Sequence, residues 1–378
     1  MIPYGRQNIA ESDVESVIEI LNSDWLTQGP VVEEFECAIA NYVGVQYAVS
    51  ASNATAALHL ACRALDLEPG DTLWTSPNTF LASANCALYC GANVDFVDID
   101  SKTYNMCPFA LAEKLENAEK TGKLPKIIIP VHFAGQSCDM KKISQLAKKF
   151  GCKIIEDASH AIGATYDDKK VGSCEYSDIA VFSFHPVKII TTGEGGMAVT
   201  NQEILAEKMR TLRSHGMTRN ANHMTKPSEG AWYYQQIDLG FNYRLTDIQS
   251  ALGLTQLKRI EQFIDQRRYL ANRYHQKLTD LSTQLPVHHI LNESSWHLYV
   301  IQVDNRKKIF DMLREKNIGV NVHYIPVHTQ PYYQKMGFKI GDFPNAENYY
   351  SRAISLPMYY DLRDEKQDIV IQAMKEML

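Results

Sequence analysis

The sequence predicts an α/β protein with a large domain, built on a mostly parallel sheet flanked by helices, and a small C-terminal α/β domain. Over residues 47–200, short apolar runs alternate with stretches spaced like amphipathic helices, a pattern typical of parallel sheets. Beyond residue 250 the chain turns to a long charged helical stretch and a few short strands. Because 378 residues exceed one small core, we expect domains over 1–250 and 251–378.

The strands of the large domain are expected where apolar runs are short and end at turn residues. They are 47–50, 72–76, 94–98, 126–131, 153–156, 179–182 and 196–200, with helices near 57–64, 79–89 and 140–150. Only a turn region separates the last two strands. We therefore expect one antiparallel pair in an otherwise parallel sheet.

The C-terminal part is expected to begin with a charged helix that connects the two domains. This helix spans 254–281, and it is followed by strands at 296–302, 320–324 and 353–356, a helix at 307–316 and a last helix at the C-terminus.

Composition argues against several classes of function. A net charge of -6 disfavours general nucleic-acid binding. No apolar run is long enough to cross a bilayer, and the N-terminus lacks the basic and apolar regions of a signal peptide. All 8 cysteines lie between Cys37 and Cys174, without the paired spacing of a zinc site. We expect a cytoplasmic protein without a metal centre, a membrane contact or a nucleic-acid partner.

One lysine lies between an apolar strand and a glycine-rich turn. Lys188 ends Phe-Ser-Phe-His-Pro-Val-Lys and precedes Thr-Thr-Gly-Glu-Gly-Gly, while Asp157 ends a separate apolar run. A solvated lysine and a helix-capping aspartate would be the ordinary explanations. Together, however, they are what an enzyme dependent on pyridoxal 5'-phosphate (PLP) needs: a lysine for the Schiff base and an acid for the pyridine nitrogen. A carboxylate that faces the protonated pyridine nitrogen at about 4 Å gains roughly 4 kcal/mol at an effective dielectric near 20.

Further groups would complete such a site. Thr55 follows a strand-to-helix junction, where a hydroxyl and backbone amides can bind phosphate, although helix capping explains the same residues. Ser183 is a second phosphate candidate. Phe80 could stack on the ring or belong to the core. His160 could reach the ring or be a satisfied core histidine.

With these residues in hand, the chain resembles the DegT/DnrJ/StrS family of sugar aminotransferases, a branch of the fold-type I PLP enzymes. The resemblance runs nearly end to end. It rests on Thr27-Gln-Gly29, Asn53-Ala-Thr55, Ser76-Pro-Asn-Thr-Phe80, Glu156-Asp-Ala-Ser-His160, Phe182-Ser-Phe-His-Pro-Val-Lys188, Arg213-Ser-His-Gly216 and Gly240-Phe-Asn-Tyr-Arg-Leu-Thr246.

The resemblance implies the cofactor, in its PLP and pyridoxamine (PMP) forms, and the residues around it. Lys188 would be the catalytic residue. The cofactor-binding set would be Ala54, Thr55, Phe80, Asp157, His160, Ser183, Lys188 and Asn242. Asn242 would reach the phosphate from a second subunit, which implies a homodimer with shared active sites.

Within the family the chain most resembles the transaminases of pseudaminic acid biosynthesis, on the segments 131–137, 215–217 and 319–326. This implies amino transfer from L-glutamate to C4 of UDP-2-acetamido-2,6-dideoxy-β-L-arabino-hex-4-ulose, a UDP-linked 4-keto sugar. The product would be UDP-4-amino-4,6-dideoxy-N-acetyl-β-L-altrosamine. The implied substrate contacts, each of which core or dimer packing could also explain, are Tyr4, Trp25, Leu26, Thr27, Asn53, His185, His215, Asn321, His323 and Tyr324.

Other functions stay open to different degrees. The nearest alternative is a C4 aminotransferase for another nucleotide-linked 4-keto sugar, of the bacillosamine, legionaminic acid or 4-amino-arabinose type, and glutamine could replace glutamate as donor. A PLP-dependent sugar dehydratase would carry histidine in place of Lys188. A cofactor-binding regulator would carry a DNA-binding module, and no such segment is visible. A dinucleotide-binding dehydrogenase would need a Gly-x-Gly-x-x-Gly motif after the first strand, which is absent.

Overall fold

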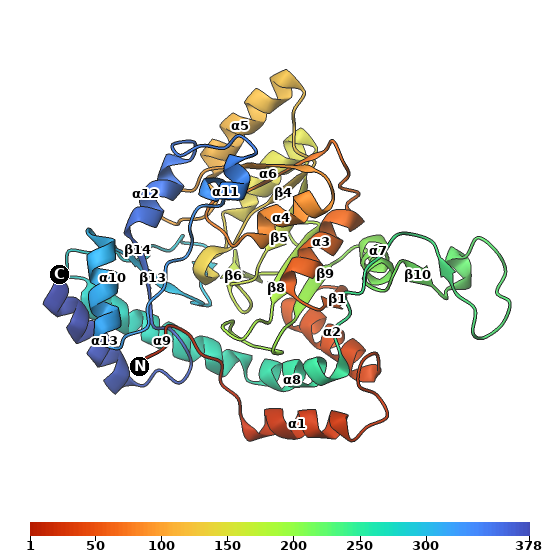
Figure 1. Cartoon of the computed structure of the whole chain (residues 1–378), viewed down its shortest axis with the longest axis horizontal. Helices are drawn as coiled ribbons and strands as arrows, with labels where there is room; N and C mark the ends of the chain where they lie inside the picture. Colours follow the sequence, from red (N-terminus) through yellow and green to blue (C-terminus); the bar gives the residue numbers. More distant parts are fainter.

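A computed structural model describes all 378 residues, and its centre is a seven-stranded sheet in the order β1-β9-β8-β5-β4-β2-β3 (Figure 1). The strands are β1 (Tyr47–Ala51), β2 (Thr72–Thr75), β3 (Asn93–Phe96), β4 (Ile127–Ile129), β5 (Lys153–Asp157), β8 (Ile179–Ser183) and β9 (Gly196–Thr200). Strands β3, β2, β4, β5 and β8 run parallel to one another, whereas β9 is antiparallel to both β8 and β1. The predicted mostly parallel sheet with helices around it is confirmed.

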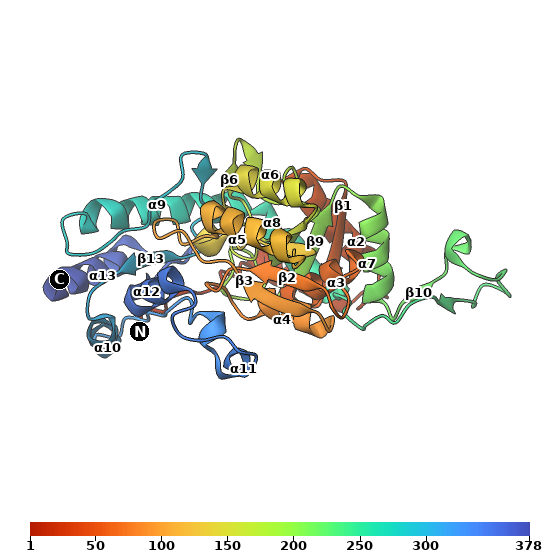
Figure 2. The same cartoon turned by 90° about the horizontal axis from the view of Figure 1, so that it is seen from above.

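Helices cover both faces of this sheet. In Figure 2, α5 and α6 lie above the strands and α4 lies below them. The helices of the large domain are α1 (Glu11–Leu21), α2 (Pro30–Val43), α3 (Ala54–Ala64), α4 (Ala82–Tyr89), α5 (Pro108–Thr121), α6 (Met140–Phe150) and α7 (Glu203–Arg213). Helix α6 has the predicted bounds because Asp139 accepts a hydrogen bond from the Lys142 amide at its start, while Gly151 ends it with a φ of 73°.

The three isoleucines of β4 explain why the strands of the sheet are continuous apolar runs in the sequence. Ile127 and Ile129 point to the face covered by α3 and α4, and Ile128 points to the face covered by α5 and α6. All three are fully buried. Both faces are therefore core, as expected for a parallel sheet.

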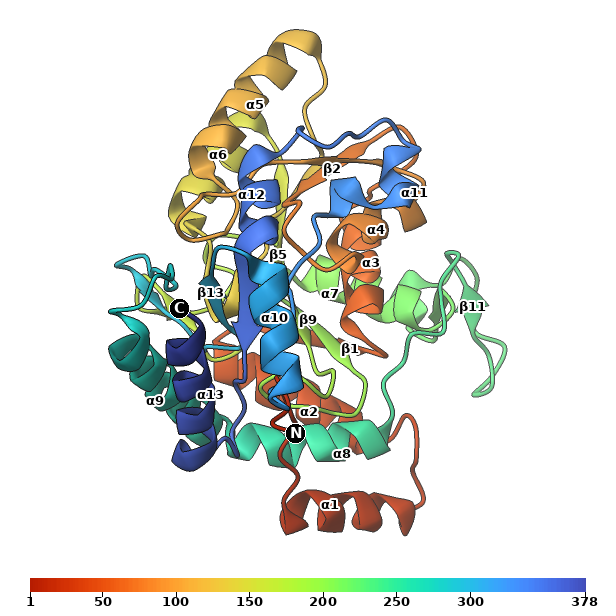
Figure 3. The same ribbon diagram turned by 60° about the vertical axis from the view of Figure 1, so that its left-hand side comes forward.

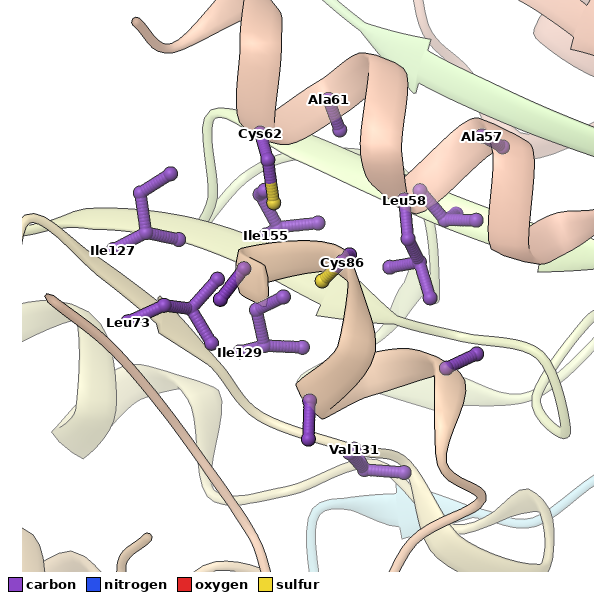
Figure 4. Close-up of a cluster of buried hydrophobic side chains, with 14 of the residues drawn as sticks. Ala57, Leu58, Ala61, Cys62, Leu73, Cys86, Ile127, Ile129, Val131 and Ile155 are labelled. Atoms are coloured by element: carbon purple, nitrogen blue, oxygen red, sulfur yellow. The ribbon is translucent and has the colours of Figure 1, made fainter. Parts of the chain in front are cut away.

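Small side chains let α3 and α4 approach each other over the sheet. Figure 4 shows Cys62 of α3 and Cys86 of α4 in one cluster with Ile127, Ile129 and Ile155 of the sheet. The packing fixes the start of each helix relative to the strand ends below it.

The C-terminal part forms a second core of its own. Buried residues from Leu270 to Met374 pack together with Ile2, which lies beside Ile318. The N-terminus accordingly lies next to α10 and α13 in Figure 3. The elements are α8 (Asp247–Lys258), α9 (Ile260–Leu278), β13 (Tyr299–Gln302), α10 (Arg306–Glu315), α11 (Pro331–Gln334), α12 (Pro344–Arg352), β14 (Ala353–Leu356) and α13 (Asp364–Met377). The division at residue 250 stays a prediction.

Two predicted elements in this part are wrong. The single helix over 254–281 is two helices, α8 and α9, that break at Arg259, whose guanidinium bonds to Asn8 and to the buried Asp13. The strand over 320–324 does not form. Beyond one bridge from Asn321 to Ser355, the chain turns to the large domain instead, and the amide of Tyr324 donates to the side chain of Asn78.

Short elements complete the fold. An arm of β10 (Met217–Thr218) and β11 (Gln235–Gln236) projects from the body beyond α7 in Figures 1 and 2. A small sheet joins β6 (Thr165–Tyr166), β7 (Lys169–Lys170) and β12 (Asn292–Glu293), and 3-10 turns occur at Phe133–Gly135, Ala221–His223 and Val327–Thr329. No helix combines the length and apolar character needed to span a lipid bilayer.

Candidate active site

A cavity of about 790 Å³ lies at the carboxyl ends of the parallel strands. Asp157 and Ser183 are the last residues of the paired strands β5 and β8, and both line it. This edge of a parallel sheet is where open α/β folds bind ligands. The N-terminal turn of α3 and the segment 321–324 of the C-terminal part close the cavity from other sides.

Lys188 lines this cavity beside Asp157. Burial lowers the pKa of Lys188 to about 8, although the nearby Asp157 carboxylate acts in the opposite direction. A pKa in this range leaves part of the amine neutral near physiological pH. A buried lysine of this kind can act as a nucleophile and as a base.

Asp157 is 5% exposed, and hydrogen bonds fix both of its carboxylate oxygens. Oδ2 accepts from the hydroxyl of Ser83 at 2.5 Å, and Oδ1 accepts from the amide of Ser159 at 3.1 Å. The carboxylate is therefore held in one orientation, with a lone pair on each oxygen left for a ligand.

The strand that presents Asp157 is also held on its other face. There His132 lies 2.6 Å from Glu156, which accepts a further hydrogen bond from Ser177. Burial alone would lower the pKa of His132, but its contacts with Cys138 and Glu156 outweigh burial and raise the pKa to about 10. The Cys138 amide donates to Nδ1 of His132, so Nε2 carries the ring proton and donates it to Glu156. This buried hydrogen bond anchors the end of β5.

The N-terminal turn of α3 is shaped for an anion. Asn53 caps the helix by accepting from the Ala56 amide at 2.8 Å, while the amides of Ala54 and Thr55 lack an acceptor within the helix. Strand β9 can lie against this turn only because residue 196 is glycine. A Cβ there would come within 2.5 Å of the Asn53 carbonyl carbon.

Neutral imidazoles line the same cavity as the lysine. The Ala134 amide donates to Nδ1 of His160 at 3.3 Å, so the proton of the neutral ring is on Nε2 and is donated to the Tyr324 hydroxyl at 3.0 Å. Burial, together with the charge of Lys188, lowers the pKa of His160 well below its usual value and that of His323 to about 3. The tyrosine hydroxyl proton is free to point into the cavity.

Most of the residues that the sequence singled out meet here. Those that line the cavity are Tyr4, Asn53, Ala54, Thr55, Phe80, Asp157, His160, Ser183, His185, Lys188, Asn321, His323 and Tyr324. The structure does not bring Trp25, Leu26, Thr27, His215 or Asn242 to the cavity of the same chain. His215 and Asn242 lie together at the base of the arm, where the His215 amide bonds to Phe241.

Sequence reasoning missed several lining or supporting residues. Thr79, Ser159 and Glu194 line the cavity, and Ser83 supports it from behind. The available signal was a pair of polar residues flanking the start of the apolar helix α4, Thr79 just before it and Ser83 in its first turn. A second, more open cavity of about 550 Å³ lies between α9 and residues 286–296 and holds none of the predicted site residues.

The profile of the DegT/DnrJ/EryC1/StrS aminotransferase family matches residues 7–375. The chain belongs to this family. Members of the family are PLP-dependent, and the protein is a PLP-dependent sugar aminotransferase with the fold of that group. An amine, a fixed carboxylate and a helix N-terminus in one cavity fit the cofactor.

Curated relatives align over almost their whole length. The spore coat polysaccharide biosynthesis protein SpsC of Bacillus subtilis is 42% identical, with 100% of this chain and 97% of the relative covered. The UDP-4-amino-4,6-dideoxy-N-acetyl-beta-L-altrosamine transaminase of Campylobacter jejuni is 38% identical, with 97% and 95% covered. Among solved structures, Helicobacter pylori PseC, an aminotransferase involved in the biosynthesis of pseudoaminic acid, has a TM-score of 0.91 at 34% identity, with 99% and 98% covered.

Proposed function

We propose that the protein transfers an amino group from L-glutamate to C4 of a UDP-linked 4-keto-6-deoxy-N-acetylhexosamine, as a step of pseudaminic acid biosynthesis. The observation that carries the chemistry is the convergence of Lys188, Asp157 and the α3 N-terminus in one cavity. Support for this sugar comes from the likeness to the Campylobacter transaminase and to PseC.

Each residue of the cavity then has a definite task. Lys188 holds the cofactor covalently between turnovers and, once displaced, moves a proton between the donor α-carbon or the sugar C4 and the cofactor. Bound PLP supplies the electron sink for this transfer. The Asp157 carboxylate keeps the ring nitrogen protonated.

The remaining predicted contacts hold the cofactor in place. The amides of Ala54 and Thr55, with the hydroxyls of Thr55 and Ser183, bind the phosphate. Phe80 covers one face of the ring, and its side chain, 59% exposed, stands open toward the cavity. His160 donates a hydrogen bond to Tyr324 as a neutral ring and would lie near the bound cofactor.

A second copy of the chain completes the site in this proposal. The predicted contacts Trp25–Thr27, His215 and Asn242 lie outside their own chain's cavity. They sit close to exposed apolar side chains of α1 and the arm, namely Val14, Ile18, Leu21, Trp232, Tyr234 and Leu239. Exposed apolar faces of this kind favour a closed homodimer.

The eight cysteines are all unpaired, which fits a reducing compartment, and we propose that the reaction takes place in the cytoplasm.

The test is a product assay with defined substrates. The purified holoenzyme is incubated with L-glutamate and, separately, with each candidate UDP-linked 4-keto sugar, and the products are identified by NMR. We expect UDP-4-amino-4,6-dideoxy-N-acetyl-β-L-altrosamine as the main product, and none with Lys188→Ala. Absence of that product, while another sugar is aminated, would contradict the proposed substrate but leave the aminotransferase in place.

A second candidate substrate follows from the higher identity to SpsC, whose name specifies no sugar. A different nucleotide-linked 4-keto sugar would use the same lysine and the same cofactor contacts. The NMR assay separates the two candidates, because it identifies the sugar and the configuration at each carbon of the product. Replacing L-glutamate by L-glutamine in the same assay identifies the donor.

A further inference from the structure

Two buried hydroxyls connect the segment before α4 to the Asp157 carboxylate. Ser83, in the first turn of α4, is fully buried, and its Oγ lies 2.5 Å from Oδ2 of Asp157. Thr79, 2% exposed, places its Oγ1 2.8 Å from the same Ser83 Oγ. The three side chains form a continuous chain of hydrogen bonds that ends at the carboxylate.

The direction of these bonds follows from the ionised carboxylate. It has no proton to give, so Ser83 must donate to Oδ2. The only hydroxyl hydrogen of Ser83 is then used, and Thr79 must donate to the oxygen of Ser83. Each donor polarises the next, which strengthens the bond that reaches the charge.

We propose that Ser83 and Thr79 are positioning residues that hold the Asp157 carboxylate against the cofactor ring nitrogen. This inference rests on the proposed role of Asp157. With Oδ2 bound by Ser83 and Oδ1 by the Ser159 amide, the carboxylate plane is fixed from two sides. Rotation of Asp157 away from the ring would leave a buried hydroxyl without its acceptor, which is costly.

The same segment also fixes other walls of the cavity. Asn78 accepts from the Tyr324 amide, and the amide of Val327 donates to the Pro77 carbonyl. Phe80 projects from the same short stretch, between Thr79 and α4. Residues 77–83 therefore couple the orientation of the acid, the ring-stacking aromatic and the tyrosine.

The test measures cofactor binding as well as turnover. Ser83→Ala removes the donor to Asp157, and Thr79→Val removes the outer donor with little change of shape. A matched control is Thr75→Val, since Thr75 is a fully buried threonine whose hydroxyl bonds to the Ile129 carbonyl and not to Asp157. Each variant is titrated with PLP to obtain a Kd, and the visible circular dichroism of the bound cofactor reports its orientation.

We expect Ser83→Ala to weaken PLP binding about tenfold or more and to change the circular dichroism band, as the loss of a hydrogen bond to a charged group predicts. Thr79→Val should weaken PLP binding about threefold, because it removes the hydrogen bond between two neutral hydroxyls, which reaches Asp157 only through Ser83. Thr79→Ser, which keeps the hydroxyl, should restore most of that loss. The control Thr75→Val should keep the wild-type Kd and spectrum.

Two results would overturn the inference. One is wild-type affinity and dichroism in Ser83→Ala, and the other is an equal loss in Ser83→Ala and Thr75→Val, which would indicate general destabilisation. Asp157→Asn separates this inference from the proposed function. If Asp157→Asn binds PLP poorly while Ser83→Ala is normal, only the positioning role fails; if Asp157→Asn is itself normal, the proposed role of Asp157 fails as well.

Discussion

The inner wall of the cavity differs in environment from the exposed surfaces of α1, the turn after it and the arm, which are together called the outer face here. On the wall, Asp157 and Ser83 are buried and hydrogen-bonded to each other. On the outer face, Trp25 is 58% exposed, and Trp232 and Leu239 of the arm are 73% and 71% exposed. The comparison shows that a single chain holds the groups for the chemistry in fixed positions. Predicted substrate contacts on the outer face, such as Trp25, are exposed to solvent in a single chain.

The largest expected effect lies on the inner wall. Lys188→Ala should lower amino transfer by about a thousandfold or more, because nucleophile and proton carrier are lost together. The measurement is product formation from L-glutamate and the keto sugar, with borohydride fixation and mass spectrometry as a control. Fixation of the cofactor on a different lysine would break the assignment.

Whether residues of the outer face complete the partner's active site can be tested by combining two inactive variants in one dimer. Lys188→Ala and Asn242→Glu should each be nearly inactive as homodimers, the second because its carboxylate would repel the phosphate in the partner's site. Co-folded heterodimers should regain up to about a quarter of wild-type activity, because random pairing restores one intact site in half of the dimers. If mixing restores nothing although heterodimers form, the sites are not shared.

The next effect concerns the contact between β9 and the α3 N-terminus. Gly196→Ala would place a methyl group 2.5 Å from the Asn53 carbonyl carbon and push this turn away. We expect about tenfold weaker binding of PLP, and little change for pyridoxal, which lacks the phosphate. Gly5→Ala is the control, since its added Cβ would meet its nearest neighbour at 4.0 Å. Equal losses for PLP and pyridoxal would contradict a phosphate site there.

The smallest effect is a shift in the titration of the lysine. In the cofactor-free protein, acylation of the Lys188 amine should rise with pH and reach half its maximum near pH 8, because burial lowers the pKa to about 8. Asp157 raises this pKa, so Asp157→Asn should move the midpoint to lower pH. Mass spectrometry of the labelled peptide measures both profiles. A midpoint that stays unchanged in Asp157→Asn would show that the two groups do not interact.

The sequence predicted the strands of the sheet and the pair Lys188 and Asp157 because those signals are local. Apolar runs and their turn residues lie within a few positions of each other, and helix α6 appears with its predicted bounds. The family resemblance extended the prediction to thirteen of the cavity residues.

The residues that escaped prediction depend on contacts between distant parts of the chain. Ser83 and Asp157 are 74 residues apart, and no spacing rule indicates that their side chains meet. The segment 320–324 has the composition of a strand, but tertiary contacts with Asn78 override it. The helix break likewise lies at Arg259, which bonds to Asp13, 246 residues earlier.

The pairing of Ile2 with Ile318 has a consequence for the order in which the chain acquires its structure during synthesis. The amide of Ile2 donates to the Asn317 carbonyl, and Gly319 donates back to Ile2, so the first residues have no partner until more than 300 others have been made. Closing so long a loop is slow compared with forming the βαβ units in between. We therefore expect the central sheet to assemble first on the ribosome, with the N-terminal strand-like segment and the wall that carries Tyr4 joining only after residues 317–319 have been made.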